Sequence, residues 1–239
     1  MKNDTMKLLE SIQNNINEGT TEDNFIKQCE ESGQFDKWQM NEIKNGFRHG
    51  LSMEEVQVYA KPEFDSGQMY EIGNGFYNGL SMEEVQVYAK PEFNKSQMHI
   101  IRVDFREGLS MEQVLTYAKP EFNENQMDEI SDGFYDGLSI EEVQVYAKPE
   151  FSSEQMEEIR NGFDRNLSME EIQVYAKPEF NSDQMCEIRY GFYDLSMEQV
   201  QIYAKPEFDS SQMEEIRDGL INGLSMEEIK KKLENQSNT

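Results

Sequence analysis

The stretch DSGQMYEIGNGFYNGLSMEEVQVYAKPEF, residues 65–93, decides the fold because close copies of it fill most of the chain. A period of roughly 20–50 residues is typical of a repeat array, in which one small unit stacks on copies of itself. The sequence therefore predicts seven tandem repeats. Each copy contains a Gln-Met pair, and the methionines follow one another at 29 residues five times and then at 28: Met40, Met69, Met98, Met127, Met156, Met185 and Met213.

The first half of each copy carries the signals of an α-helix, here called the first helix of the repeat. Asp65 and Gln68 have the spacing of a capping box, and the other copies hold only Asp, Asn or Ser at the cap position. Met69 and Phe76 then fall on one helical face. Gly79 lies where a left-handed residue ends a helix, so we expect a helix of about 13 residues.

A second helix is predicted directly afterwards, because Ser81 and Glu84 form another capping-box pattern and Pro91 stops the helix near residue 89. Its apolar residues lie on two sides, as expected for an element packed between neighbouring repeats. Gly75 recurs inside the first helix, which predicts a close approach of the two helices. Asp104 replaces that glycine in the third copy, where we expect looser or rotated packing.

The fold class predicted is all-α, an α-solenoid of seven short two-helix repeats with a divergent N-terminal capping hairpin. We expect the capping hairpin over residues 1–35, with helices near 8–16 and 25–29. The repeats occupy residues 36–232 as one solenoid, and residues 233–239 are expected to form a disordered tail. The handedness of the superhelix and the oligomeric state stay open.

Composition limits the possible partners and compartment. The formal net charge of −26 argues against direct binding to nucleic acid or anionic lipid, and it favours a protein partner with a basic surface. No apolar run approaches the roughly 20 residues of a membrane helix, and the N-terminus lacks the apolar core of a signal peptide. Cys29 and Cys186 occupy unrelated positions of the repeat, which favours a reducing, cytoplasmic location.

No motif for catalysis, a cofactor or a metal ion is found. His49 and His99 lie in different copies with no recurring partner, and we interpret both as solvated surface residues. Cys186 stands at a variable position. The sequence has no calcium-loop, phosphate-loop, dinucleotide or zinc spacing. We therefore expect a protein that is not an enzyme and needs no cofactor or metal.

One stripe of the first helix varies between copies while its surroundings are nearly constant. Counted from each repeat methionine, the places +1, +5 and +8 lie on one side of the helix, away from the apolar face. Tyr and Arg side chains suit interface anchors, so the stripe predicts a partner-binding surface; neutral drift on a solvent face is the alternative. Its candidate residues are Tyr70, Tyr77, Arg106, Tyr135, Tyr190 and Tyr193.

A glutamate recurs, by contrast, at one place in the first turn of every second helix. Acidic residues there offset the helix dipole, but that role does not explain the whole acidic surplus. Such a series of carboxylates could resemble a phosphate backbone to a basic groove. We call the following six residues the second-helix glutamates and predict that they also bind the partner: Glu54, Glu83, Glu112, Glu141, Glu170 and Glu198.

The motif YAKPEF…QMEEIRNG…GLS resembles tandem acidic repeats of uncharacterised bacterial proteins, often associated with mobile elements, over residues 36–229. The resemblance implies a host–parasite role, such as blocking a defence protein, and assigns no functional residue. Two hypotheses follow. The chain is an acidic inhibitor that occupies a nucleic-acid-binding surface of a partner, or it is a structural scaffold that joins protein partners.

Overall fold

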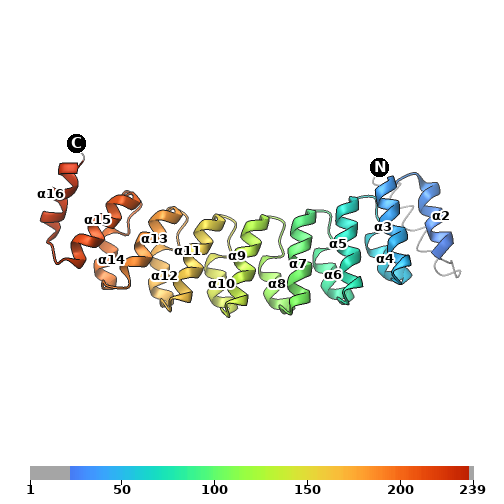
Figure 1. Cartoon of the computed structure of the whole chain (residues 1–239), viewed down its shortest axis with the longest axis horizontal. Coiled ribbons are helices and arrows are strands. Elements are labelled where there is room, and N and C mark those ends of the chain that lie inside the picture. Colours follow the sequence, from blue (N-terminus) through green and yellow to red (C-terminus); the bar gives the residue numbers. More distant parts are fainter. Residues whose placement is uncertain (1–21, 237–239) are drawn as a thin grey trace. The chain divides into compact units, whose positions relative to one another are not determined.

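The computed structural model describes residues 22–236 and is all-α over that range, with short turns between helices and no β-strand. The chain divides into two compact units, one ending at Pro120 and the other beginning at Glu121. Each unit is a helical-repeat solenoid in which a longer first helix alternates with a shorter second helix, as the sequence predicts (Figure 1).

The unit that ends at Pro120 begins with one helix of the predicted capping hairpin, α2, at Glu22–Ser32. The other helix predicted for that hairpin, near residues 8–16, falls outside the described residues. Three repeats follow. Their first helices are α3 (Lys37–Arg48), α5 (Ser66–Tyr77) and α7 (Lys95–Glu107), and their second helices are α4 (Met53–Tyr59), α6 (Met82–Tyr88) and α8 (Met111–Tyr117).

The unit that begins at Glu121 contains four repeats of the same form. Their first helices are α9 (Glu124–Tyr135), α11 (Ser153–Asp164), α13 (Ser182–Gly191) and α15 (Ser210–Ile221). Their second helices are α10 (Ile140–Tyr146), α12 (Met169–Tyr175), α14 (Met197–Tyr203) and α16 (Met226–Gln236).

Both predicted capping boxes form in every repeat. At the start of α5, the Asp65 carboxylate accepts a hydrogen bond from the Gln68 backbone N–H, and Gln68 Oε1 accepts one from the Asp65 N–H, each at 2.8 Å. At the start of α6, Ser81 and Glu84 exchange the equivalent bonds at 3.2 and 2.6 Å. These bonds satisfy backbone donors that the first turn of a helix leaves unpaired.

The helices also end as their sequences require. Except in the shortened repeat, the turn after the first helix passes through a left-handed residue, which is Gly79 in one repeat (φ 86°) and Asn166 in another (φ 61°). The second helix ends in an inverse γ-turn at Ala89 (φ −70°, ψ 61°), where the N–H of Lys90 donates to the Tyr88 carbonyl oxygen at 2.7 Å.

The last second helix, α16, continues to Gln236, so the prediction of a disordered tail from residue 233 is wrong for residues 233–236. The remaining residues, 237–239, lie outside the described range. In this copy Leu233 and Asn235 stand where the other repeats have the alanine and the proline of the Ala-Lys-Pro turn. Without the proline, the backbone N–H groups needed to extend a helix are present.

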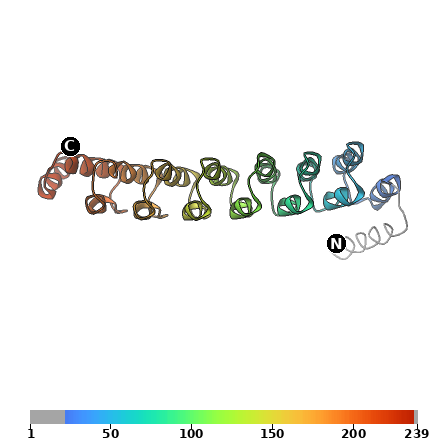
Figure 2. The ribbon, with the colours of Figure 1, turned by 90° about the horizontal axis from the view of Figure 1, so that it is seen from below.

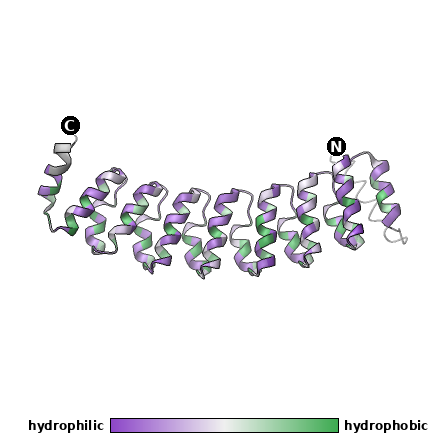
Figure 3. Cartoon of the chain, viewed as in Figure 1, coloured by the Kyte–Doolittle hydropathy of each residue, from purple (hydrophilic) through white to green (hydrophobic). Residues whose placement is uncertain are grey.

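Within each unit the helices form two layers and share one apolar core (Figure 2). First helices pack on the first helices of the next repeat, as α3 does on α5 and α9 on α11. A second helix packs against the first helix of its own repeat and, where a further repeat follows in the same unit, against that repeat's first helix too, as α4 does against α3 and α5. The helices of each unit accordingly carry both hydrophobic and hydrophilic residues (Figure 3).

The predicted close approach of the two helices is confirmed, and a tyrosine causes it. A Cβ built on Gly75 would overlap the hydroxyl group of Tyr88, whose ring is fully buried. Gly46, Gly133, Gly162 and Gly191 meet the tyrosines of their own second helices in the same way. The sequence analysis missed these tyrosines, which are the largest fully buried side chains of the second helices.

The repeat with Asp104 is not more loosely packed, so the first of the two expectations is wrong, and rotated packing stays a prediction. Tyr117 is as fully buried as its equivalents, and its hydroxyl group donates a 2.5 Å hydrogen bond to Asp104 Oδ2, which is itself buried. Aspartate fits at this position because its carboxylate accepts a hydrogen bond from the phenol hydroxyl group. Repeats with glycine at this position instead leave space for the phenol, because glycine has no side chain.

Candidate partner-binding surface

The variable stripe of the first unit places two tyrosines in solvent. Tyr70 and Tyr77 on α5 are 48% and 62% exposed. Lys95 Nζ lies 5.5 Å from the centroid of the Tyr70 ring, and the His49 ring lies 5.3 Å from that of Tyr77. Arg106 on α7 is also exposed, but its guanidinium pairs with Glu107 at 2.7 Å. The stripe is therefore a surface on which aromatic rings stand beside cationic or polar groups.

The variable stripe of the second unit also carries half-exposed tyrosines, Tyr135 on α9 and the pair Tyr190 and Tyr193. The rings of that pair meet edge to face at 5.9 Å. The guanidinium carbon of Arg189 lies 4.7 Å from the centroid of the Tyr190 ring. Cation–π contact and edge-to-face packing restrict the rotamers of the pair, so it is a partly preorganised aromatic patch.

The second-helix glutamates are exposed in all six repeats that contain them. The ion pairs formed among the described residues use other carboxylates. Hydrogen bonds from its own backbone N–H and from the Ser196 hydroxyl group lower the pKa of Glu198. The glutamates therefore point negative charge at solvent from equivalent places in each unit.

The structure reveals a second recurring acidic position, which the sequence analysis missed. The glutamate two places after a repeat methionine pairs with the arginine four places after the next repeat methionine, so the pair joins the first helices of adjacent repeats. The signal is visible in the sequence as a spacing of 31 residues, or 30 across the shortened repeat. The pairs are Glu71–Arg102, Glu129–Arg160, Glu158–Arg189 and Glu187–Arg217.

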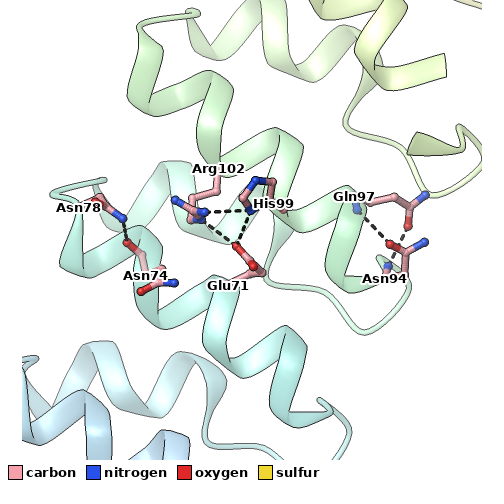
Figure 4. A network of polar contacts seen from close by, with 7 residues as sticks. All are labelled: Glu71, Asn74, Asn78, Asn94, Gln97, His99 and Arg102. Carbon is pink, nitrogen blue, oxygen red and sulfur yellow. Dashed lines mark hydrogen bonds and ion pairs between the residues drawn. The ribbon is translucent and has the colours of Figure 1, made fainter. Parts of the chain in front are cut away.

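The most buried of these pairs joins α5 to α7 (Figure 4). Arg102 Nε donates to Glu71 Oε2 at 2.9 Å, and the two side chains are 7% and 2% exposed. His99 Nδ1 lies 3.0 Å from Arg102 Nη2 and 3.2 Å from Glu71 Oε2. The interpretation of His99 as a purely solvated histidine is therefore wrong, although about half of its side chain is exposed.

The pairs of the second unit are less buried but bind more groups. Arg160 reaches Glu129 Oε2 through two nitrogens at 3.0 and 3.2 Å, and it reaches Asp136 at 2.7 Å. Burial raises the pKa of Glu129, and the hydrogen bonds from Arg160 counter that rise. Contacts of one side chain with two carboxylates suit arginine better than lysine, because the planar guanidinium presents five N–H donors in fixed directions.

Neither cysteine is built as a nucleophile. Cys29 is fully buried on α2, and burial followed by the charge of Glu30 raises the pKa of its thiol to about 12. Burial also raises the pKa of Cys186, which is half-buried rather than fully exposed. A raised pKa keeps a thiol protonated and unreactive at neutral pH.

The part of the chain that the structure describes contains no cluster of three or more His, Cys, Asp or Glu side chains arranged to hold a metal ion. Within that part, no helix has both the length and the apolar character needed to span a membrane.

The comparisons with known proteins identify no relative. The sequence matches no protein-family model, no curated protein and no solved structure. The tandem helical repeat is therefore established from the chain itself, and the resemblance to bacterial acidic repeats receives no further support.

Proposed function

We propose that this chain is a non-enzymatic, protein-binding repeat protein that occupies a basic, nucleic-acid-binding surface of its partner. One observation carries the proposal: the second-helix glutamates are exposed at equivalent places, whereas other glutamates, buried or partly buried, form the ion pairs that join the first helices of adjacent repeats, as Glu71, Glu129 and Glu158 do. The exposed charge is thus separate from the charge that holds the fold together.

Charge and aromatic residues would contribute differently to such binding. A surface of one sign accelerates encounter with an oppositely charged partner, with an association rate that falls as salt is added. Half-exposed tyrosines supply apolar area that is buried after encounter, which mainly slows dissociation. The resemblance to repeats associated with mobile elements agrees with this role. In this proposal the partner is a defence protein, and the chain inhibits it in the cytoplasm.

The test begins with affinity capture from the cells that make the protein, followed by purification of the captured partner. We expect the partner to bind DNA or RNA and to lose it when this chain is added. Changing Glu112, Glu141 and Glu170 to Lys should slow association roughly tenfold at low salt and weaken its salt dependence. Circular dichroism must first show that the variant folds, because lysine at a helix N-terminus is unfavourable.

A charge-matched control reverses three exposed glutamates of the linkers, Glu121, Glu150 and Glu179. If this control slows association as much as the first variant does, the effect comes from net charge and not from the surface that carries the second-helix glutamates. The proposal is contradicted if the partner keeps its nucleic acid when this chain is added. It is also contradicted if the partner binds the first variant as it binds the unmodified chain but no longer binds after Tyr70, Tyr77, Tyr190 and Tyr193 are changed to Ala. The latter result would support the alternative, a scaffold that joins protein partners.

A further inference from the structure

A cavity of about 200 Å³ lies between α3 and α5 in the first unit. Glu42 and His49 line it on the α3 side, and Tyr70, Gly73 and Tyr77 line it on the α5 side. Sites for cofactors and drug-sized ligands usually measure roughly 300–1,000 Å³, whereas a water molecule takes about 30 Å³. The cavity therefore has the size for one side chain of a partner.

The junction between α11 and α13 shows what fills the equivalent place elsewhere in the chain. Arg189 occupies it, and two of its guanidinium nitrogens lie 2.9 and 3.0 Å from Glu158 Oε2. Its Nη1 also donates to the Tyr193 hydroxyl oxygen at 3.1 Å. A carboxylate from one repeat and a phenol from the next thus hold a single guanidinium group.

The α3–α5 junction keeps both of these partners and lacks the cation. Counted from the repeat methionines, Glu42 has the place of the carboxylate and Tyr77 that of the phenol. Gly73 has the place of the arginine. Glu42 is half-buried, and its Oε1 accepts a long hydrogen bond of 3.4 Å from Asn41; among the described residues no lysine or arginine forms an ion pair with it.

Crowding does not explain the glycine at this position. A Cβ built on Gly73 would lie 3.6 Å from the nearest atoms of the Tyr59 ring, which is ordinary van der Waals distance. Its φ is helical, so a side chain causes no backbone strain. Gly75, two residues later, differs because its Cβ would overlap Tyr88. Gly73 therefore leaves space open, although glycine is a poorer helix former than alanine.

The geometry points to a docking site for one arginine side chain of the partner, held by Glu42 and Tyr77 in the space that Gly73 leaves. This inference rests on the proposed function, because it supplies a specific contact within binding to a basic protein. The partner's guanidinium would complete, from outside, the interaction that Arg189 completes from inside the chain. Tyr70 forms a further aromatic wall of the cavity, suited to cation–π contact.

The test uses a short peptide with a single arginine and the same peptide with citrulline, which has the same shape and no charge. In NMR titrations of the full chain we expect the arginine peptide to shift the backbone signals of Gly73 and Asn74 saturably, with a Kd in the range of about 1 mM. The citrulline peptide should bind at least roughly tenfold more weakly, because the charge-assisted hydrogen bond is lost.

Two variants give the matched comparison. Gly73→Arg should fill the cavity with its own guanidinium, abolish peptide binding and raise Tm. Gly73→Ala should also raise Tm through helix propensity, yet keep peptide binding within about twofold. Glu42→Gln should weaken binding roughly tenfold. The inference is overturned if arginine and citrulline peptides bind equally, if Gly73→Arg binds like the unmodified protein, or if no saturation occurs by about 10 mM.

These results are separable from the fate of the proposed function. If a basic partner binds the Gly73→Arg variant as tightly as the unmodified chain, the arginine site is not part of the interface. That result would leave the proposed role of the exposed glutamates unaffected. An arginine peptide that binds as expected, together with a captured partner that is not displaced from nucleic acid, would keep the site and reject the function.

Discussion

Gln126 Nε2 donates a 2.6 Å hydrogen bond to the carbonyl oxygen of Phe151, a residue 25 positions later, while Gln126 Oε1 accepts the N–H of its own N-cap, Asn123. The same side chain also reaches the Pro149 carbonyl oxygen at 3.2 Å. One amide therefore caps the first helix of a repeat and ties the start of that repeat to its end, directly before the next repeat begins. This explains why the third helical position of the capping box is always Gln in first helices, whereas it is Glu or Gln in second helices.

Replacing Gln126 by Glu should destabilise the protein although the capping bond survives. The carboxylate has no N–H to give to the two carbonyl oxygens, and it is buried beside them, which should cost at least about 2 kcal/mol of unfolding free energy. The matched control is Glu142→Gln in a second helix, where Gln already occurs in other repeats, as at Gln113. Urea unfolding measures both, and similar losses in the two variants would contradict the double role of Gln126.

Replacing Gly133 by Ala should destabilise the protein, although alanine is normally the better helix residue by about 1 kcal/mol. The added methyl group would overlap the Tyr146 hydroxyl group, and overpacking of this kind typically costs about 1–3 kcal/mol. Tyr146→Phe should restore most of the loss, because it removes the overlapping oxygen. That oxygen is buried and has no hydrogen-bond partner among the described residues.

The thermodynamic cycle of Gly133 and Tyr146 checks this account. Tyr146→Phe alone should change the unfolding free energy by less than about 1 kcal/mol, since no hydrogen bond is lost. If the double variant is as unstable as Gly133→Ala, the hydroxyl group is not what the glycine accommodates.

Removing Arg102 should cost much more than removing Arg106 four residues later. Arg102→Met leaves the buried Glu71 carboxylate without its guanidinium partner and with the half-exposed His99 ring as its remaining neighbour, and loss of one partner of a buried pair typically costs about 3–5 kcal/mol. Arg106→Met breaks an exposed pair with Glu107, where the change should stay within about 0.5 kcal/mol. Adding Glu71→Gln to Arg102→Met should recover part of the loss. Chemical denaturation of the four proteins gives the comparison, and equal effects of the two methionine variants would refute it.

The protein should lose stability in alkaline solution. Burial raises the pKa of five second-helix tyrosines above the ordinary value of 10.0: Tyr59, Tyr88, Tyr146, Tyr175 and Tyr203. A group whose pKa is higher in the folded state contributes stability that is complete below the unfolded pKa and is lost as pH rises above it. Tm should therefore fall between pH of about 10 and about 12.

Circular dichroism at a series of pH values measures this fall, and the ultraviolet absorbance of tyrosinate shows whether the buried rings ionise together with unfolding. Tyr146→Phe should make the fall shallower, because it removes one of the groups that titrate. An unchanged Tm up to a pH of about 11 would mean that the buried phenols do not limit alkaline stability.

The sequence by itself determined the repeat and the local structure of each helix. Capping boxes, the left-handed residue at Gly79 and the stop at Pro91 depend on residues a few positions apart, whose relative geometry the helix fixes. Exposure of Tyr70 and Tyr77 also followed from helical periodicity. The extension of α16 to Gln236 also has a local cause, because this copy has Asn235 in place of the proline that ends the other second helices.

Only the tertiary structure decided which side chains meet between repeats. Glu71 and Arg102 are 31 residues apart, and their contact depends on how far each first helix is shifted and turned relative to the next, which no local rule supplies. The cavity at Gly73 follows from the same cause, because its glycine is meaningful only beside Glu42 of the preceding repeat. Buried side chains such as Tyr88 set the packing distances between helices. Those distances decide whether two residues at a given sequence spacing form an ion pair or leave an open site.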